Sequence, residues 1–280
     1  MSHTTLVSVA DLAAHLDDAN WIACDCRHDL ANYHFGRHAY AQSHIPGARF
    51  LHLDEDLSGP KTGTNGRHPL PHPITFTLRL AALGIDNTKQ IVAYDSAGGP
   101  YAARLWWMLR WVGHTRAAVL DGGWDAWTAA GKPVDAMLPA IKPASYNPHP
   151  APQLAVDARL VQKNIGGNDI RVLDARSPER FRGDNETLDP VAGHIPGATN
   201  RFFKQNLDDG GRFKPGATLK DEFAALLDTQ SPAGVVHQCG SGVTACHNLL
   251  AMEIAGLSGS RLYPGSWSEW VSDRTRPVER

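Results

Sequence analysis

The chain of 280 residues repeats its own pattern once, and this repeat constrains the fold more than any other feature. Three short motifs recur in the same order in the two halves: Asp-x-Arg at Asp25 and Asp174, His-Ile-Pro-Gly-Ala at His44 and His194, and Gly-x-Trp at Gly122 and Gly265. The offsets between partners lie between 143 and 150 residues. Because the period is as long as a whole domain, the repeat indicates two copies of one domain rather than a solenoid.

Each copy alternates short apolar runs with helical patterns. The runs at 90–94, 170–173 and 234–238 predict strands, and apolar residues at helical spacing predict helices over 102–112 and 243–255. Both helices are followed by a glycine, Gly113 and Gly256. Strand–helix alternation is typical of the α/β class, so we predict two tandem domains, each a mainly parallel sheet flanked by helices.

A proline-rich segment separates the two copies. Six prolines fall between Lys132 and Gln153, and proline disfavours both helices and strand pairing. We therefore predict a first domain over 1–135, a linker over 136–153 and a second domain over 154–280.

The composition argues against several classes of partner and location. The net charge of −2 offers no electrostatic basis for binding nucleic acid or an anionic membrane. No apolar run approaches the roughly 18–20 residues of a membrane span, and the first 20 residues contain three aspartates and no Lys or Arg, unlike a signal peptide. The four cysteines form no Cys-x-x-Cys pair, which favours reduced thiols. These features predict a cytoplasmic protein.

The loop that begins at Cys239 carries the clearest chemical signal. An apolar strand leads into Cys-Gly-Ser-Gly-Val-Thr at 239–244 and a predicted helix follows, the place where open α/β sheets hold their sites. Gly240 and Gly242 permit a turn whose backbone N–H groups converge on an anion, and the helix N-terminus adds positive charge. Both effects favour a thiolate, so Cys239 is predicted to be a nucleophile.

The loop also fits two other interpretations. One is a buried cysteine in a tight strand–helix turn. The other is a cysteine phosphatase, but such an enzyme requires an arginine six residues after the cysteine to bind phosphate, and this chain has Ala245 there.

With the loop and the repeat together, the chain resembles the tandem-domain rhodanese family, and within it the 3-mercaptopyruvate sulfurtransferase branch. The Cys-Gly-Ser-Gly-Val-Thr loop, the two His-Ile-Pro-Gly-Ala motifs and the two tryptophan motifs carry the resemblance, which spans about residues 6–278. It implies that a donor gives its sulfane sulfur to Cys239 and that the persulfide passes it to a thiophilic acceptor such as cyanide or a thiol. It implies no cofactor and no metal, and it allows a thiol protein as acceptor.

The resemblance also implies roles for further residues. The backbone amides of Gly240, Ser241, Gly242, Val243 and Thr244 would hold the persulfide. Arg180 would bind the anionic end of the donor, as a guanidinium suits a carboxylate or a thiosulfate oxyanion. Ser241, with His68 and Asp54, matches a proposed proton relay for a keto-thiol donor.

The chain departs from the family pattern in two places. The branch usually has a second arginine after the position of Arg180, whereas here the segment 184–190 is acidic, and Arg182 is the nearest substitute. In the first copy, Asp95 stands where Cys239 stands in the second, so we predict a catalytically silent first domain. The alternatives that stay open are a thiosulfate-preferring rhodanese and a persulfide-carrier module with little turnover.

Overall fold

The computed structural model describes residues 2–280, which divide into two compact units. The first comprises the residues up to Gly59, Pro71–Ala151 and Gly210–Arg212, and the second comprises Pro60–Leu70, Pro152–Asp209 and Phe213–Arg280. The segment Pro60–Leu70 therefore packs with the second unit, although it lies in the first half of the chain. The division at 135 and 153 stays a prediction.

The first unit is built on a five-stranded parallel sheet with the strand order β1-β5-β4-β2-β3. Its strands are β1 (Leu6–Val7), β2 (Trp21–Asp25), β3 (Arg49–Phe50), β4 (Gln90–Tyr94) and β5 (Ala117–Leu120). The predicted strand over 90–94 is β4 itself. All five residues of β4 are buried, as expected for a central strand covered on both faces.

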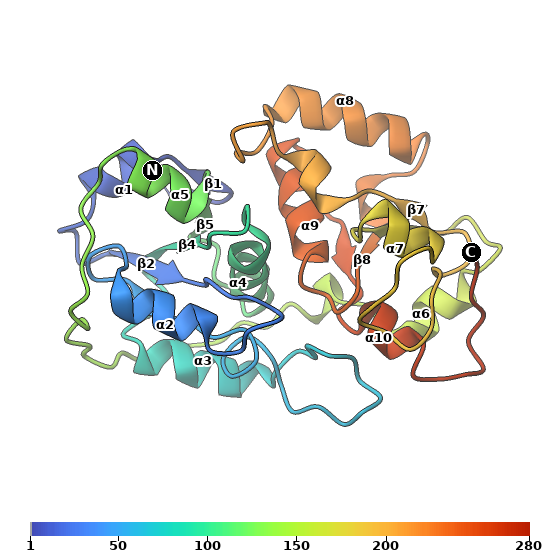
Figure 1. Cartoon of the computed structure of the whole chain (residues 1–280), viewed down its shortest axis with the longest axis horizontal. Helices are drawn as coiled ribbons and strands as arrows, with labels where there is room; N and C mark the ends of the chain where they lie inside the picture. The colour runs from blue at the N-terminus through green and yellow to red at the C-terminus, as the bar shows by residue number, and fades with distance from the viewer. Residues whose placement is uncertain (1) are drawn as a thin grey trace. The chain divides into compact units, whose positions relative to one another are not determined.

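Helices cover both faces of this sheet: α1 (Val9–Ala14), α2 (Phe35–Gln42), α3 (Pro73–Ala82), α4 (Pro100–Trp111) and α5 (Gly123–Ala129). In Figure 1, α1 and α5 lie on one side of the strands and α3 on the other. Leu12 of α1 and Trp127 of α5 share one core cluster with Val92 of β4. The helix predicted over 102–112 is α4, which starts two residues earlier because Pro100 fits the first turn of a helix.

The second unit has a four-stranded parallel sheet in the order β7-β6-β8-β9. Its strands are β6 (Arg171–Asp174), β7 (Thr199–Asn200), β8 (Val235–Gln238) and β9 (Arg261–Leu262). This order matches β3-β2-β4-β5 of the first unit, and a parallel bridge between Ala155 and Leu262 takes the place of β1. The predicted α/β class with parallel sheets is confirmed. The strand predicted over 170–173 lies one residue later, as β6, and the strand predicted over 234–238 starts one residue later, as β8.

The helices of the second unit are α6 (Ala158–Lys163), α7 (Pro178–Arg182), α8 (Gly216–Leu227), α9 (Ala245–Ile254) and α10 (Ser266–Trp270), with short 3₁₀ turns at Pro152–Leu154, Phe203–Asn206 and Pro232–Gly234. The helix predicted over 243–255 is α9. It begins two residues later because Val243 and Thr244 belong to the turn that carries Cys239 out of β8. Trp267 and Trp270 of α10 are fully buried and anchor one core of this unit.

The proline-rich segment forms no α-helix and runs along the first unit. It is tied there by backbone hydrogen bonds from Ala144 to Ala81 (2.9 Å) and from Ala151 to Trp111 (2.8 Å). No helix within residues 2–280 has the length and apolar character needed to cross a membrane.

Candidate active site

Cys239 follows directly after β8, and only 2% of its surface is exposed. The turn that follows needs glycine at position 242, where φ is 76° and a Cβ would lie 2.3 Å from the carbonyl oxygen of Pro264. This turn brings the N–H of Gly242 to the sulfur, and it donates to Sγ of Cys239 at 3.1 Å. With the N-terminus of α9 next in the chain, the loop favours an anion at this sulfur.

The first turn of α10 holds the backbone of this loop. The N–H of Cys239 donates to Oγ of Ser266 at 3.1 Å, and its carbonyl accepts from the N–H of Trp267 at 3.0 Å. The carbonyl of Gly240 accepts from the N–H of Ser268 at 3.0 Å. Ser266 is fully buried and has a φ of 54°, which is unusual for a residue other than glycine. Sequence analysis missed Ser266, because the Gly-Ser-Trp motif identified the repeat without showing what its hydroxyl contacts.

In the first unit, Asp95 occupies a similar cradle at the end of β4. Its buried carboxylate accepts four backbone hydrogen bonds of 2.8–2.9 Å, from Ala97, Gly99, Tyr101 and Ala102. Burial raises the pKa of Asp95 against the opposing effect of these four bonds. The first copy, which has Asp95 in place of a cysteine at this position, thus keeps the anion cradle and fills it with a carboxylate, a group that cannot accept a sulfane sulfur.

Ser241 and His68, which sequence analysis placed in one relay, meet in the structure. Nδ1 of His68 lies 2.8 Å from Oγ of Ser241, and both side chains are buried. His68 belongs to the segment Pro60–Leu70, which packs with the second unit. A hydroxyl and an imidazole at this distance form a route along which a proton can move.

Arg180, on α7, faces the residue that follows the nucleophile. A Cβ on Gly240 would lie 3.4 Å from each terminal nitrogen of Arg180. Its guanidinium forms a bidentate pair with Glu186 at 2.9–3.2 Å and a further contact of 3.2 Å with Asp189. The acidic segment therefore folds back onto the predicted donor-binding arginine. Burial raises the pKa of Glu186, but its hydrogen bonds to Arg180 and to the backbone hold that pKa below its usual value.

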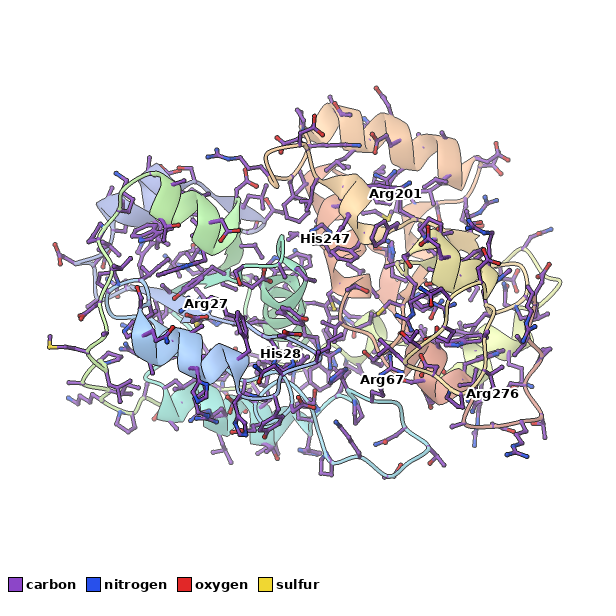
Figure 2. All side chains as sticks on the ribbon, viewed as in Figure 1. Arg27, His28, Arg67, Arg201, His247 and Arg276 are labelled. Carbon is purple, nitrogen blue, oxygen red and sulfur yellow. The ribbon has the colours of Figure 1, made fainter. Side chains whose placement is uncertain are left out.

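Arg67 is a second basic side chain at this site, and sequence analysis did not find it. It pairs with Asp189, whose side chain is buried, and a Cβ on Gly240 would lie 2.8 Å from its Nη2 atom. Figure 2 shows Arg67 beside α10, and its backbone N–H donates to Oγ of Ser268 at 3.0 Å. The only signal in the sequence was its position next to His68.

Two other arginines of the second unit have structural roles. Arg182 is mostly exposed and pairs with Asp184 at 2.8 Å, so it does not take the place of the second arginine of the family pattern. Arg176 is buried, forms a bidentate pair with Asp174 and donates to the carbonyl of Gly193 at 2.8 Å. It ties the loop after β6 to the backbone at Gly193.

Asp54 lies in the first unit, where its carboxylate is 3.9 Å from Nε2 of His28. With His52, these residues place three ligand-type atoms within 4.8 Å of one another. Both ring nitrogens of His52 are already engaged, because Nδ1 accepts from the N–H of Asp54 at 3.1 Å and Nε2 is 2.9 Å from the carbonyl of Tyr33. His52 therefore has no ring nitrogen left to bind a metal.

The remaining predicted residues frame the loop or lie in the cores. Val243 is buried, and Thr244 is the N-cap residue of α9, although its side chain makes no capping hydrogen bond. Cys246 is buried and its thiol lies 3.4 Å from the carbonyl of Gly242. In the first unit, burial raises the pKa of Cys24 to about 12 and that of Cys26 well above its usual value, as fits core thiols.

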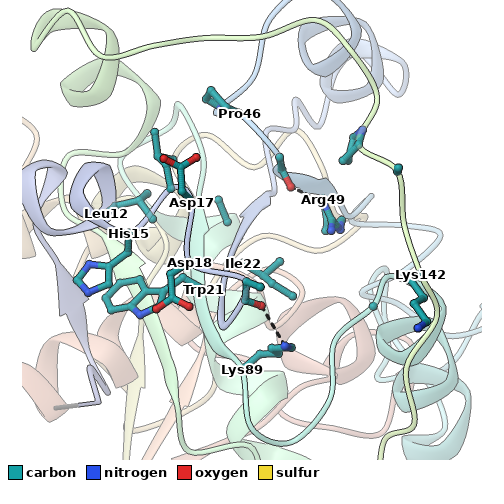
Figure 3. A pocket seen from close by; sticks show the side chains of 17 residues that line it. Leu12, His15, Asp17, Asp18, Trp21, Ile22, Pro46, Arg49, Lys89 and Lys142 are labelled. Carbon is teal, nitrogen blue, oxygen red and sulfur yellow. Dashed lines mark hydrogen bonds between the residues drawn. The ribbon is translucent and has the colours of Figure 1, made fainter.

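Figure 3 shows a hollow of about 380 Å³ on the first unit. It lies where β2 and β4 begin, near Trp21 and Lys89, and none of the predicted site residues lines it. Open α/β sheets hold their ligands at the opposite, carboxyl ends of the strands. Lys89 and Arg49 also direct their donors to the carbonyls of Ala19 and Gly47, so we do not place the active site here.

Comparison with known proteins identifies the family of the chain. The rhodanese-like domain pattern matches residues 8–130 and 157–273, which confirms the predicted tandem arrangement. The chain is 44% identical over 280 residues to the "Probable 3-mercaptopyruvate sulfurtransferase" of Pseudomonas aeruginosa, covering 99% of both chains. It is 34% identical to the thiosulfate sulfurtransferase of Gallus gallus, covering 84% of this chain and 80% of the relative.

A solved structure has the same fold. The chain is similar to 3-mercaptopyruvate sulfurtransferase from Leishmania major, with a TM-score of 0.87 and 29% identity. The match covers 98% of this chain and 76% of that one.

Proposed function

Because the chain belongs to the rhodanese family, we propose that it is a sulfurtransferase that moves a sulfane sulfur from 3-mercaptopyruvate to a thiophilic acceptor through a persulfide on Cys239. The observation that carries the choice of donor is the 2.8 Å contact between His68 and Ser241. A keto-thiol donor needs a proton when its carbon–sulfur bond breaks, and Ser241 of this pair is two residues after the nucleophile in the chain.

In the first half-reaction, the Cys239 thiolate attacks the thiol sulfur of 3-mercaptopyruvate. A sulfur–sulfur bond forms, the carbon–sulfur bond breaks, and its electron pair passes into the enolate of pyruvate. Ser241, supported by His68, delivers the proton that converts the enolate to pyruvate. We keep Asp54 as the third member of this relay on the basis of the family resemblance.

In the second half-reaction, the acceptor attacks the outer sulfur of the persulfide. With cyanide, a carbon–sulfur bond forms, the sulfur–sulfur bond breaks, and the Cys239 thiolate returns. The N–H of Gly242, 3.1 Å from Sγ, stabilises negative charge on the nucleophile, and the neighbouring amides of 240–244 complete the cradle. Arg180 binds the anionic end of the donor. Thiol proteins are proposed as further acceptors.

The second candidate is a thiosulfate-preferring rhodanese, favoured by the likeness to a thiosulfate sulfurtransferase. With thiosulfate, sulfite leaves with the electron pair of the sulfur–sulfur bond and no proton is needed.

We further propose that the first copy is catalytically silent, because Asp95 fills its cradle. A cytoplasmic location is proposed because all four cysteines are free thiols, which suits a reducing compartment.

Steady-state thiocyanate formation with the two donors side by side tests this proposal, with Cys239→Ser as the blank. A kcat/KM at least about tenfold higher for 3-mercaptopyruvate, about 1.4 kcal/mol in transition-state binding, supports the assignment. The reverse preference makes the protein a thiosulfate sulfurtransferase. Persulfide formation without turnover makes it a carrier module.

A further inference from the structure

The hollow of Figure 3 belongs to the first unit alone, because every residue that lines it lies in that unit. Its volume of about 380 Å³ is within the range of small-molecule sites in proteins. Apolar side chains, Leu12 and Ile22 among them, form part of its surface. Three basic side chains, Arg49, Lys89 and Lys142, form another part. Apolar walls with a few charged groups are the usual composition of a ligand site.

Backbone carbonyls hold two of these basic side chains in place without using all of their donors. Arg49 donates from Nε to the carbonyl of Leu83 at 3.1 Å and from Nη1 to the carbonyl of Gly47. Nη2 of Arg49 has no acceptor among the described residues. Lys89 donates to the carbonyl of Ala19 at 3.0 Å, which leaves two of its three N–H groups. Neither side chain forms an ion pair in the part of the chain that the structure describes, so both charges are available to a ligand.

The proline-rich segment supplies the third cation, Lys142, whose side chain makes no hydrogen bond or ion pair with any described residue. Its backbone is fixed, because a Cβ on Gly84, where φ is 77°, would lie only 2.9 Å from the carbonyl oxygen of Lys142. Before this point in the chain, Nε2 of His44 lies 3.2 Å from the carbonyl of Met137. The stretch 139–142 is thus tied to the first unit at both ends and forms one wall of the hollow.

The acidic side chains of the hollow lie away from two of these cations. Figure 3 shows Asp17 and Asp18 on the opposite side of the hollow from Arg49 and Lys142. Oδ1 of Asp18 accepts the N–H of Asn20 at 2.8 Å, and Asp17 is exposed to solvent. An anion placed beside the cations would therefore be attracted by them while keeping its distance from both carboxylates.

The second copy of the domain provides an internal comparison. It has a hollow of about 480 Å³ that is lined by Thr199, the residue that the repeat pairs with Arg49. Among the described residues that line this second hollow, none is a lysine, and Arg171 donates to the carbonyl of Leu226 at 2.6 Å. A hollow at this place is thus common to both copies, whereas the cluster of three cations is found in the first copy only.

We propose that the hollow of the first unit is a binding site for a small ligand with an oxyanion group, which Arg49, Lys89 and Lys142 hold together. Donors from three separate segments surround one space, and an oxyanion offers several acceptor oxygens to such donors. A phosphate ester and a polycarboxylate share this chemistry. Cys239 belongs to the other unit, so the site takes no part in the persulfide steps and does not depend on the proposed function.

Pyridoxal 5′-phosphate and pyridoxal test the site as a matched pair of probes, because they carry the same aldehyde with and without a phosphate. In each case the lysine amine adds to the aldehyde, water leaves, and added borohydride reduces the imine to a stable secondary amine. Mass spectrometry of the peptides gives the rate of labelling at Lys89 and Lys142. Lys220, an exposed lysine of the second unit, is the internal reference.

After division by the rate at Lys220, we expect the phosphorylated probe to label Lys89 or Lys142 at least about tenfold faster than pyridoxal does, the effect of one charge-assisted hydrogen bond. Pyrophosphate and citrate are added as separate competitors, and the one that protects at the lower concentration identifies a phosphate or a carboxylate ligand. Equal rates for the two probes, or no protection by either competitor, would overturn the proposal.

Variants then test which side chains hold the anion. Arg49→Gln should lower the preference for the phosphorylated probe at least about threefold, and Arg116→Gln, at an exposed arginine of the same unit, should leave it unchanged. Should Arg49→Gln not fold, Lys142→Gln, at an exposed position, is measured instead, and the preference at Lys89 should fall by a similar factor. A preference that survives in the variant measured contradicts the proposed cluster.

Discussion

Nδ1 of His68 lies 2.8 Å from Oγ of Ser241, although 173 residues separate the two in the chain. The contact links the segment before α3 to the loop that carries the nucleophile. It gives the site an acid–base pair that 3-mercaptopyruvate requires as a donor and thiosulfate does not. The relation between these two residues therefore sets the donor preference that we expect.

Ser241→Ala should distinguish the donors. We expect kcat/KM for 3-mercaptopyruvate to fall about 100-fold, the lower end of the contribution of a general acid. The value for thiosulfate should change less than about threefold, because sulfite leaves without a proton. Ser260→Ala is the control, because Ser260 is a serine of the same unit with the same 6% exposure. Equal losses with both donors would rule out the relay.

Ser266 should be a positioning residue for Cys239. The repeat places Gly123 at the same site in the first unit, where φ is 57°. Ser266→Ala loses the acceptor for the N–H of Cys239 and keeps the strained backbone, so it should lower the free energy of unfolding by about 2 kcal/mol. Ser266→Gly relieves that strain and should lose about 1 kcal/mol less. Urea unfolding measures both, and a Gly variant less stable than the Ala variant would contradict this account.

Asp95 should stabilise the first unit rather than take part in catalysis. Asp95→Ala leaves four N–H groups, three of them buried, without their acceptor, and we expect it to lower the free energy of unfolding by about 3 kcal/mol or more. Asp125→Ala, on the surface of α5, should change it by less than about 0.5 kcal/mol. Thermal or urea unfolding of both variants makes the comparison, and equal effects would show that the cradle is not held by its carboxylate.

His237 should make the protein less stable in acid. Burial lowers its pKa to about 3 in the folded chain, whereas an exposed histidine has a pKa near 6.5. Between these values the unfolded chain binds a proton that the folded chain does not, so stability falls as the pH falls through this window. At pH 5 this amounts to about 2 kcal/mol.

His237→Leu should remove that part of the pH dependence. Urea unfolding at pH 7 and pH 5 should show a smaller drop in the variant than in the wild type, while His38→Gln, at an exposed histidine, should retain the full drop. A drop of the same size in His237→Leu would show that His237 is not the group responsible.

The sequence was informative where the signal was local. The sequence predicts β4 at its observed bounds and the ends of β8 and α9 to within two residues. These predictions succeed because the hydrophobic pattern of a buried strand or helix lies in residues that are neighbours in the sequence. The glycine-rich loop indicated Cys239, and the repeat indicated Asp95 as its counterpart in the first copy. Ser241 and His68 were found through a family resemblance, since no spacing rule joins residues so far apart.

The residues that escaped sequence analysis depend on long-range packing. Arg67 reaches the site because Gly66 packs on the backbone of Gly265, a contact that no periodicity encodes. The acidic residues after Arg180, Glu186 among them, carry the wrong charge to bind an anionic donor. In the structure their loop folds back, and the carboxylate of Glu186 orients the guanidinium of Arg180. The sign of the charge on Glu186 therefore did not predict its role, which depends on its pairing with Arg180.

The most direct test of the account is the mass of the Cys239 peptide after the protein meets 3-mercaptopyruvate without any acceptor. We predict the addition of one sulfur atom on Cys239, one equivalent of pyruvate, and loss of that sulfur as thiocyanate when cyanide is added. Cys239→Ser should show none of these. Pyruvate or thiocyanate formed by Cys239→Ser at the wild-type rate, or a wild-type Cys239 that gains no sulfur, would contradict the account.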